Sequence, residues 1–147
     1  MAGYSGTPLI RKLGFRPGQR ALLCGVPEEL PEITGFADFA VRHTHRDGAA
    51  LYDLVMIFET ERDRLEAWAA KLPELLSHDG MVWIAWPKKA SRRPTTLSED
   101  VLRQVLLPLG LVDVKVCAID FVWSGLKFVV RQELRARWPA GANPGEH

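Results

Sequence analysis

A short apolar segment that runs directly into a glycine turn constrains the fold of this chain more than any other feature. The segment Arg20–Cys24 ends in four consecutive apolar residues, a pattern typical of a strand buried on both faces of a parallel sheet. Gly25 follows at once and Pro27 comes two residues later, and both residue types turn a chain. The sequence therefore predicts a first strand at Arg20–Cys24 with a turn at its carboxyl end.

Further along the chain, apolar strand-like runs alternate with helical patterns. The other expected strands are Asp38–His43, Asp53–Phe58, Met81–Trp86, Val112–Ile119 and Leu126–Arg131. Helices are expected at Thr7–Leu13, from Thr60 to Leu76 with a kink at Pro73, and at Leu97–Leu107. The short link Asp120–Gly125 makes the last two strands an antiparallel pair. This order predicts a three-layer α/β fold, with a sheet of about six strands that is mostly parallel and has an antiparallel final strand.

The length of 147 residues suits one domain, which we expect to cover residues 1–137. Residues 138–147 contain two prolines and two glycines, and we expect them to form a disordered tail. The net charge of +1 gives no general attraction to nucleic acid, and no apolar run reaches the length of a membrane span. The amino-terminal residues lack a signal-peptide pattern, so a cytoplasmic location is expected.

Three longer stretches resemble one known fold. They are Leu13–Arg20 before the first strand, Leu72–Ile84 with its helix, turn and strand, and Leu107–Val114 before a late strand. Their order is similar to that of the class I S-adenosylmethionine-dependent methyltransferases, and the resemblance covers Leu9–Arg131. It implies a Rossmann-like, methyltransferase-like sheet with an inserted antiparallel last strand, and a pocket for S-adenosylmethionine beside the first strand.

The parts of the methyltransferase pattern that hold the cofactor are largely absent. Of the glycine-rich loop after the first strand, only Gly25 matches. The second strand ends in Arg42–His45, where the family has an acidic residue for the ribose hydroxyls. Nine residues separate His43 from Asp53, too few for the family's next helix, strand and helix, so six strands are expected rather than seven. We therefore expect a degenerate cofactor site and no cofactor, with S-adenosylmethionine as the alternative.

Four shorter motifs are similar to an uncharacterised bacterial family that is known only as a domain of unknown function. They are Tyr4–Leu9, Trp86–Ser91, Asp113–Cys117 and Trp123–Phe128. This resemblance spans nearly the whole chain without its tail. It implies no activity, because none is assigned to that family.

A cluster of cations follows the expected strand Met81–Trp86. Lys88, Lys89, Arg92 and Arg93 lie within six residues, at the carboxyl ends of the parallel strands where such sheets bind ligands. This loop suits a solvated basic surface, a site for a phosphate, carboxylate or acidic partner, or a contact to a nucleic-acid backbone. The lack of a wider basic excess argues against nucleic acid.

The final hairpin supplies the remaining candidates for this edge of the sheet. Asp120 and Lys127 have the spacing for an ion pair across the hairpin, with Lys127 reaching the same edge as the basic loop. Trp123 and Ser124 lie in the expected turn between them, where an apolar residue either contacts a partner or packs over the helix layer. We take these four residues, with Gly25 and the basic loop, as the candidate surface for a ligand or partner.

The residues that most often carry metal or nucleophilic chemistry are not arranged for it. His43 and His45 share one face of a strand but have no third ligand nearby, so no metal site is expected. Cys24 and Cys117 lie in separate apolar strands and are expected to be buried free thiols. No side chain lies in a nucleophile motif, so no catalytic residue is assigned.

These patterns favour a non-catalytic, methyltransferase-like domain that acts by binding a protein partner or a small anion at the loop Lys88–Arg93. The alternative is a divergent enzyme, a methyltransferase that binds S-adenosylmethionine or a nucleotide in an altered pocket. A third hypothesis is a nucleic-acid-binding module, whose affinity would fall steeply with salt. The fold alone does not choose among them, because function depends on the site.

Overall fold

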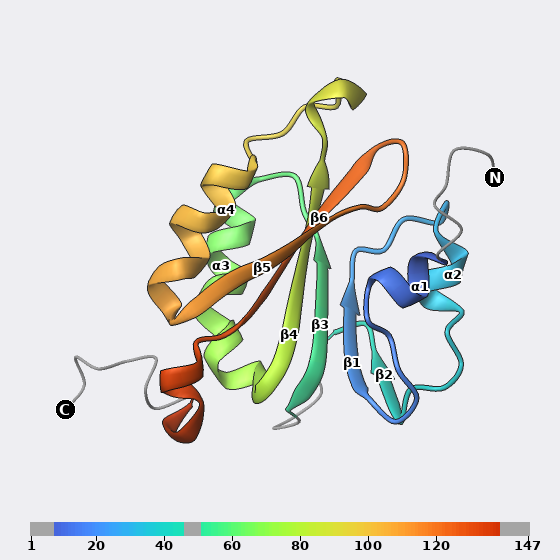
Figure 1. Cartoon of the computed structure of the whole chain (residues 1–147). Helices are drawn as coiled ribbons and strands as arrows, with labels where there is room; N and C mark the ends of the chain where they lie inside the picture. The colour runs from blue at the N-terminus through green and yellow to red at the C-terminus, as the bar shows by residue number, and fades with distance from the viewer. Residues whose placement is uncertain (1–7, 46–50, 139–147) are drawn as a thin grey trace.

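The computed structural model describes residues 8–45 and 51–138, which form a six-stranded sheet between two layers of helices (Figure 1). The strands are β1 (Arg20–Cys24), β2 (Val41–His43), β3 (Tyr52–Phe58), β4 (Leu76–Pro87), β5 (Leu111–Ala118) and β6 (Trp123–Val130). Their order in the sheet is β2-β1-β3-β4-β6-β5. Strands β1 to β4 are parallel, and β6 is antiparallel to both of its neighbours, β4 and β5. The predicted fold class, with six strands and an inserted antiparallel strand, is confirmed.

Helices cover both faces of the sheet. The two short helices α1 (Leu9–Lys12) and α2 (Pro31–Thr34) lie on one face, and the longer helices α3 (Arg62–Leu75) and α4 (Glu99–Leu106) lie on the other (Figure 1). The described residues also form three short 3-10 helices, namely η1 (Lys89–Ser91), η2 (Leu107–Leu109) and η3 (Gln132–Arg137). None of the helices in the described part of the chain is long and apolar enough to cross a membrane.

The central strands bury both of their faces, which explains their continuous apolar sequences. In β3, Leu54 and Met56 pack with the residues of the α1 and α2 layer, whereas Val55 and Ile57 pack with those of the α3 and α4 layer. All four side chains are fully buried. Such burial contributes about 1.5–3 kcal/mol for each large apolar side chain, so the apolar runs in the sequence identify the strands that stabilise the fold.

The junction between α3 and β4 differs from the predicted helix, turn and strand. α3 begins at Arg62 rather than Thr60, runs through Pro73 and ends at Leu75, and β4 begins at the next residue. The pairing of β3 with β4 shifts register over residues 77–80, which lie inside β4 and include Asp79 and Gly80, where the sequence predicted a turn. The strand includes these residues because β4 pairs with β3 on both sides of the irregularity.

The packed domain includes one residue more than the sequence predicted, because the predicted boundary was residue 137. Trp138, expected to begin the tail, is buried, and its Nε1 donates a 2.8 Å hydrogen bond to the Leu76 carbonyl oxygen. The remainder of the expected tail, residues 139–147, lies outside the described residues. The expected start of the first helix at Thr7 also lies outside the described residues. The same holds for residues 46–50, which belong to the link where the sequence predicted no strand.

Candidate functional site

The carboxyl ends of the parallel strands form one edge of the sheet, which we call the rim. β1 is followed in the chain by β2 on one side and then by β3 on the other, so the topological switch point lies between β1 and β3. Open α/β sheets bind ligands in the crevice outside such a point. Gly25 directly follows β1 and the Lys88–Arg93 loop directly follows β4, so both lie on this rim, as the sequence predicted.

The turn after β1 depends on its glycine. Gly25 has a φ of +72°, in the left-handed region that favours glycine. A Cβ atom added at this residue would lie 3.0 Å from the carbonyl oxygen of Phe58, at the end of β3. The absence of a side chain therefore lets the backbone of the turn approach the neighbouring strand closely at the switch point.

We expect Gly25→Ala to lower the free energy of unfolding by about 1–3 kcal/mol, because alanine is strained at this φ and crowds the Phe58 oxygen. Urea denaturation measures the change. Gly18→Ala is the matched control, since Gly18 has a φ of +87° but nothing lies within 4 Å of an added Cβ. Equal losses in the two variants would show that the close approach to Phe58 has no energetic importance.

The end of β2 is held by hydrogen bonds. His43 Nδ1 lies 2.6 Å from the Tyr52 hydroxyl, and the Cys24 thiol donates a 3.5 Å hydrogen bond to the Thr44 carbonyl oxygen. His45 is exposed, and the described residues include no group of three side chains that could hold a metal ion. Where the methyltransferase pattern has an acid, this strand ends in a histidine that is engaged with a buried tyrosine.

Both cysteines are buried free thiols, as predicted. Burial raises the pKa of Cys24 to about 11. Burial also raises the pKa of Cys117, although the charges of Lys12 and Lys115 oppose this effect. The two thiols therefore stay protonated at neutral pH, and a protonated thiol is a poor nucleophile.

Glu59, directly after β3, is a buried carboxylate that the predicted set of site residues omits. It is 8% exposed, and its Oε2 accepts hydrogen bonds from the backbone N–H of Thr60 (2.8 Å) and of Glu61 (3.2 Å). The Arg64 Nε donates a third bond of 2.8 Å to the same oxygen. The carboxylate thereby holds the start of α3 at the rim. Its place directly after a central apolar strand was the signal in the sequence that marked it.

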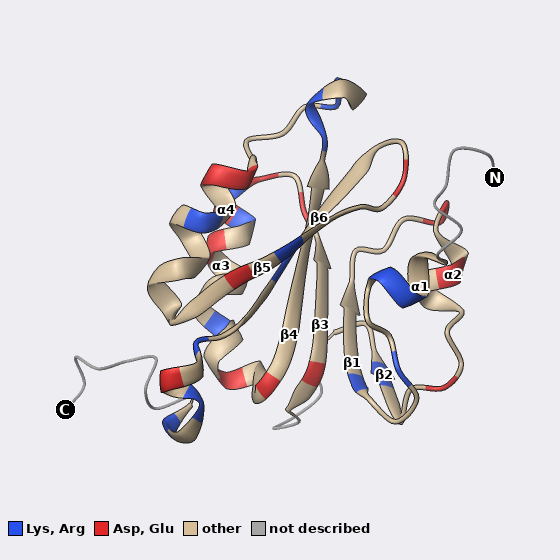
Figure 2. Cartoon of the chain, in the orientation of Figure 1, with Lys and Arg blue, Asp and Glu red and all other residues tan. Residues whose placement is uncertain are grey.

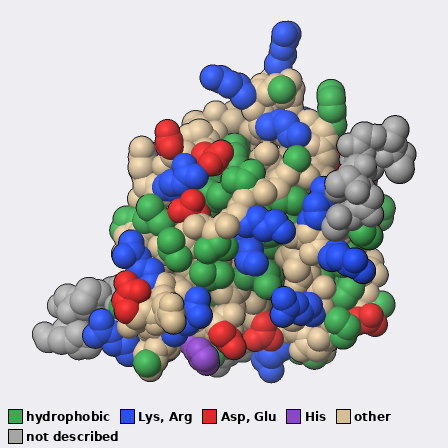
Figure 3. Space-filling view, in the orientation of Figure 1, with side chains coloured by type: hydrophobic (Ala, Val, Ile, Leu, Met, Phe, Trp, Pro, Cys, Tyr) green, Lys and Arg blue, Asp and Glu red, His purple; other side chains and the backbone are tan. Residues whose placement is uncertain are grey.

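The Lys88–Arg93 loop projects from the rim at the top of the molecule (Figure 2). Lys89, Arg92 and Arg93 are exposed, and none of them forms an ion pair with any residue that the structure describes. Figure 3 shows Lys and Arg side chains at this end extending away from one another. The loop supplies positive charge without an enclosing wall, and its binding of an anion or a partner stays a prediction.

The expected ion pair between Asp120 and Lys127 is wrong. Asp120 Oδ1 accepts hydrogen bonds from the backbone N–H of Val122 (2.8 Å) and of Trp123 (2.7 Å), so the carboxylate shapes the turn between β5 and β6. Lys127 lies farther along β6, opposite Lys115 of β5 and away from the rim. The short aspartate side chain reaches the backbone N–H groups of its own turn more easily than a lysine farther along the hairpin.

The apolar tip of the final hairpin is Phe121 rather than Trp123, and its side chain is 86% exposed. Trp123 is the buried first residue of β6, and its ring meets the Phe58 ring edge to face with centroids 5.1 Å apart. Ser124 also belongs to β6 and pairs with Trp86 of β4. Trp123 and Ser124 therefore lie in the sheet and not in the turn, because β6 begins three residues earlier than the sequence predicted.

A cavity of about 470 Å³ lies beside the rim, between α1, the segment after β1 and the carboxyl end of β5. Apolar residues such as Ile119 line it together with three acids, Glu29, Glu32 and Asp120, and one lysine, Lys12. Its volume is in the range of small-molecule sites. Acids outnumber cations in the cavity wall, so the cavity favours a ligand with positive charge. Of these residues, only Asp120 was among the predicted site residues.

No family model matches the sequence, and no curated protein matches it. Solved structures do match its fold. An S-adenosylmethionine-dependent methyltransferase from Aquifex aeolicus has a TM-score of 0.60 at 14% sequence identity, covering 83% of this chain and 88% of that chain. Magnesium protoporphyrin IX methyltransferase from Synechocystis PCC 6803, solved with bound S-adenosylmethionine, has a TM-score of 0.56 at 14% identity, covering 83% and 74%. The fold is that of the class I S-adenosylmethionine-dependent methyltransferases.

A third structure, the ribosomal protein L11 methylase from Lactobacillus delbrueckii subsp. bulgaricus, has a TM-score of 0.54 at 13% identity, covering 84% of this chain and 76% of that chain. These neighbours overturn the expectation of no cofactor, since they are methylating enzymes and one holds S-adenosylmethionine. That expectation is wrong because it relied on the glycines that are missing around Gly25. The sheet nevertheless keeps the topology of the methyltransferase fold. The resemblance to an uncharacterised bacterial family is not supported by any matching family model.

Proposed function

We propose that this chain binds S-adenosylmethionine at the rim and acts as a divergent methyltransferase. The observation that carries the proposal is the position of the cavity, which is formed in part by Glu29 and Leu30 in the segment after the glycine turn. That turn lies at the topological switch point, where open α/β sheets bind ligands. The proposal takes up the alternative function in place of the non-catalytic domain that the sequence favoured.

The charges around the cavity suit this cofactor. S-adenosylmethionine carries a positive sulfonium and a positive ammonium group, and Glu29, Glu32 and Asp120 bring three carboxylates to the cavity. The Oδ1 atom of Asp120 is engaged with the turn, which leaves its Oδ2 as an acceptor. Leu30 and Ile119 supply apolar surface in the same cavity. The wall thus offers the combination of charge and apolar area that a sulfonium nucleoside needs.

Bound S-adenosylmethionine supplies an electrophilic methyl group. The contribution that we assign to this chain is to bind and orient the reactants. Glu59 is engaged with α3 and the Cys24 thiol is protonated, so neither is assigned as a general base. The acceptor would then have to be nucleophilic by itself.

Isothermal titration calorimetry with S-adenosylmethionine and S-adenosylhomocysteine tests the proposal. We expect saturable binding, and we expect Glu29→Gln or Asp120→Asn to weaken the binding of S-adenosylmethionine about tenfold, as for the loss of one charged contact. The effect on S-adenosylhomocysteine should be smaller, because this compound lacks the sulfonium charge. Asparagine at residue 120 can still accept the two turn hydrogen bonds, so the hairpin should persist.

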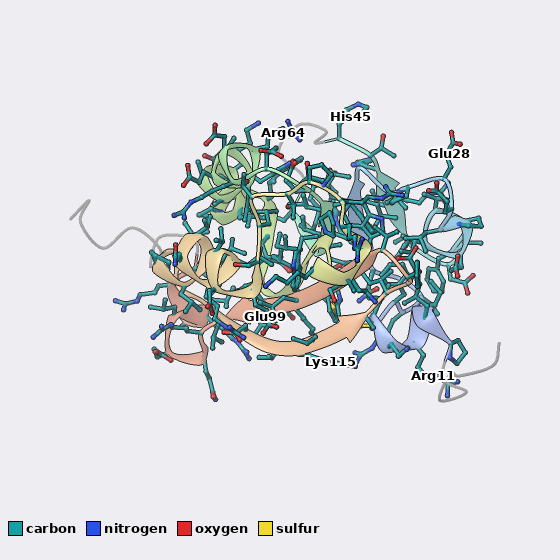
Figure 4. All side chains as sticks on the ribbon, turned by 90° about the horizontal axis from the view of Figure 1, so that it is seen from above. Arg11, Glu28, His45, Arg64, Glu99 and Lys115 are labelled. Carbon is teal, nitrogen blue, oxygen red and sulfur yellow. The ribbon has the colours of Figure 1, made fainter. Side chains whose placement is uncertain are left out.

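Glu28→Gln is the matched control for Glu29→Gln. Glu28 is the preceding residue, does not line the cavity and points outward in Figure 4. Its substitution should leave both affinities unchanged. The absence of saturable binding of either compound to the wild-type chain would sink the proposal, and an equal loss in Glu28→Gln and Glu29→Gln would exclude the cavity as the site.

A further inference from the structure

A β-bulge in β5 directs Lys115 to the face of the sheet that carries α1. The pairing of β5 with β6 shifts register between Asp113 and Lys115, with Val114 as the extra residue. In a regular strand, residues two apart share a face. Here Asp113 Oδ2 accepts a 3.1 Å hydrogen bond from Arg103 of α4, whereas the Lys115 ammonium donates a 3.1 Å bond to the Lys12 carbonyl oxygen of α1. The two side chains therefore lie on opposite faces, and the bulge is the reason.

The bulge also brings two lysines together. Lys115 and Lys127 are direct partners in the β5–β6 ladder, and like charges in this position destabilise a sheet. Lys127 is half-buried, and its burial lowers its pKa, with further lowering by the charges of Lys115 and Arg16. A destabilising pair of like charges is typical of a functional site, because selection for stability alone would remove it.

Within the described residues, no ion pair neutralises these charges. Lys12, Arg16, Lys115 and Lys127, which we call the β5–β6 cation cluster, come from α1, the loop after α1, β5 and β6. None of the four forms an ion pair with any residue of the described ranges 8–45 and 51–138. Figure 3 shows Lys and Arg side chains gathered over the middle of this face. From above, Lys115 lies on the side of the molecule where β5 and α1 are neighbours (Figure 4).

We propose that the β5–β6 cation cluster binds a small anion that carries a phosphate or diphosphate group. Lysine and arginine donors that converge from separate segments match the several oxygens of such a group. Lys12 also lines the cavity at the rim, so the anion would lie next to that cavity. The proposal goes beyond the binding of S-adenosylmethionine and does not depend on it.

A small anion fits this surface better than a polynucleotide does. Glu29, Glu32 and Asp120 line the cavity together with Lys12, so carboxylates border the cluster on that side. A nucleic-acid backbone needs an extended row of cations, because each phosphate along the strand must be neutralised.

Calorimetric titration of the full chain with sodium pyrophosphate, in the absence of S-adenosylmethionine, tests the proposal. The wild-type chain should bind pyrophosphate saturably, and Lys115→Gln/Lys127→Gln should weaken binding by about tenfold or more. Lys71→Gln/Arg137→Gln is the matched control, since it removes two exposed positive charges from α3 and η3, outside the cluster and outside the loop at the rim. The control variant should keep its affinity within about a factor of two, a change too small for the loss of a charged contact.

Thermal unfolding shows whether weaker pyrophosphate binding comes from loss of the binding site or from loss of the fold. Without ligand, Lys115→Gln/Lys127→Gln should unfold at or above the wild-type temperature, because the repulsion between the paired lysines is gone. The proposal is overturned by absent pyrophosphate binding, or by equal losses in both double variants. Binding of a single-stranded oligonucleotide that pyrophosphate does not compete away would also overturn it and favour a nucleic-acid site. Since the cofactor is left out, these outcomes do not bear on the S-adenosylmethionine proposal.

Discussion

Trp83→Ala is expected to lower the free energy of unfolding by about 3–5 kcal/mol, as for other fully buried aromatic side chains. Trp83 lies in β4 with no exposed surface, and its Nε1 donates a 2.8 Å hydrogen bond to the Leu13 carbonyl oxygen. Alanine leaves a cavity in the core on the α1 face and leaves a buried carbonyl group without its donor. Urea denaturation followed by circular dichroism measures the loss.

Trp83→Phe separates most of the contribution of core packing from that of the hydrogen bond to Leu13. Phenylalanine keeps the six-membered ring but loses the N–H donor and the pyrrole part of the indole, so the loss should be about 1–3 kcal/mol. Gly125 of β6 makes room for this ring, because a Cβ atom there would lie 3.1 Å from Trp83. Equal losses for Trp83→Phe and Trp83→Ala would assign the whole effect to the hydrogen bond and the pyrrole part of the indole. A negligible loss in both variants would contradict the packing of this core.

Trp138→Ala is expected to cost about 3 kcal/mol of unfolding free energy, although Trp138 lies outside the domain boundary that the sequence predicted. The indole packs in the core on the α3 and α4 side and donates its N–H to the Leu76 carbonyl oxygen, at the junction of α3 and β4. Loss of the ring exposes apolar surface of that core to water. Urea denaturation of the full-length variant measures the effect.

Two truncated chains test directly where the folded domain ends. A chain that ends at Trp138 and a chain that ends at Arg137 differ only in the tryptophan, so their difference in stability should match the loss in Trp138→Ala. Trp138→Phe should recover most of the loss, because the remaining ring still fills the site. Equal stability of the two truncated chains would contradict the structural role of Trp138.

The central strands were predictable because the signal for each lies within its own segment. The expected strand Arg20–Cys24 matches β1 at both ends, and the expected strand Asp53–Phe58 differs from β3 by one residue. A strand that is buried on both faces must be apolar throughout, and no distant contact is needed to recognise it. The short link between His43 and Asp53 likewise predicted a sheet of six strands, since chain length limits what a link can contain.

The final hairpin was placed incorrectly because its turn residues have roles that depend on distant partners. Gly125 was interpreted as part of a turn, whereas it lies inside β6 and accommodates Trp83. Asp120 was paired with a lysine by spacing, whereas its carboxylate binds the backbone of its own turn. A glycine that serves a turn and a glycine that leaves space for an aromatic ring have the same appearance in a sequence.

The sequence by itself determined the order of strands and helices, the number of strands and the glycine turn at the switch point. These features follow from hydrophobic period and chain length, which are properties of contiguous residues. Only the tertiary structure decided which charged side chains meet. The cavity at the rim combines residues from α1, from the segment after β1 and from the end of β5. The β5–β6 cation cluster depends on one extra residue in β5, and because side chains alternate along a strand, a shift of one residue moves Lys115 to the other face.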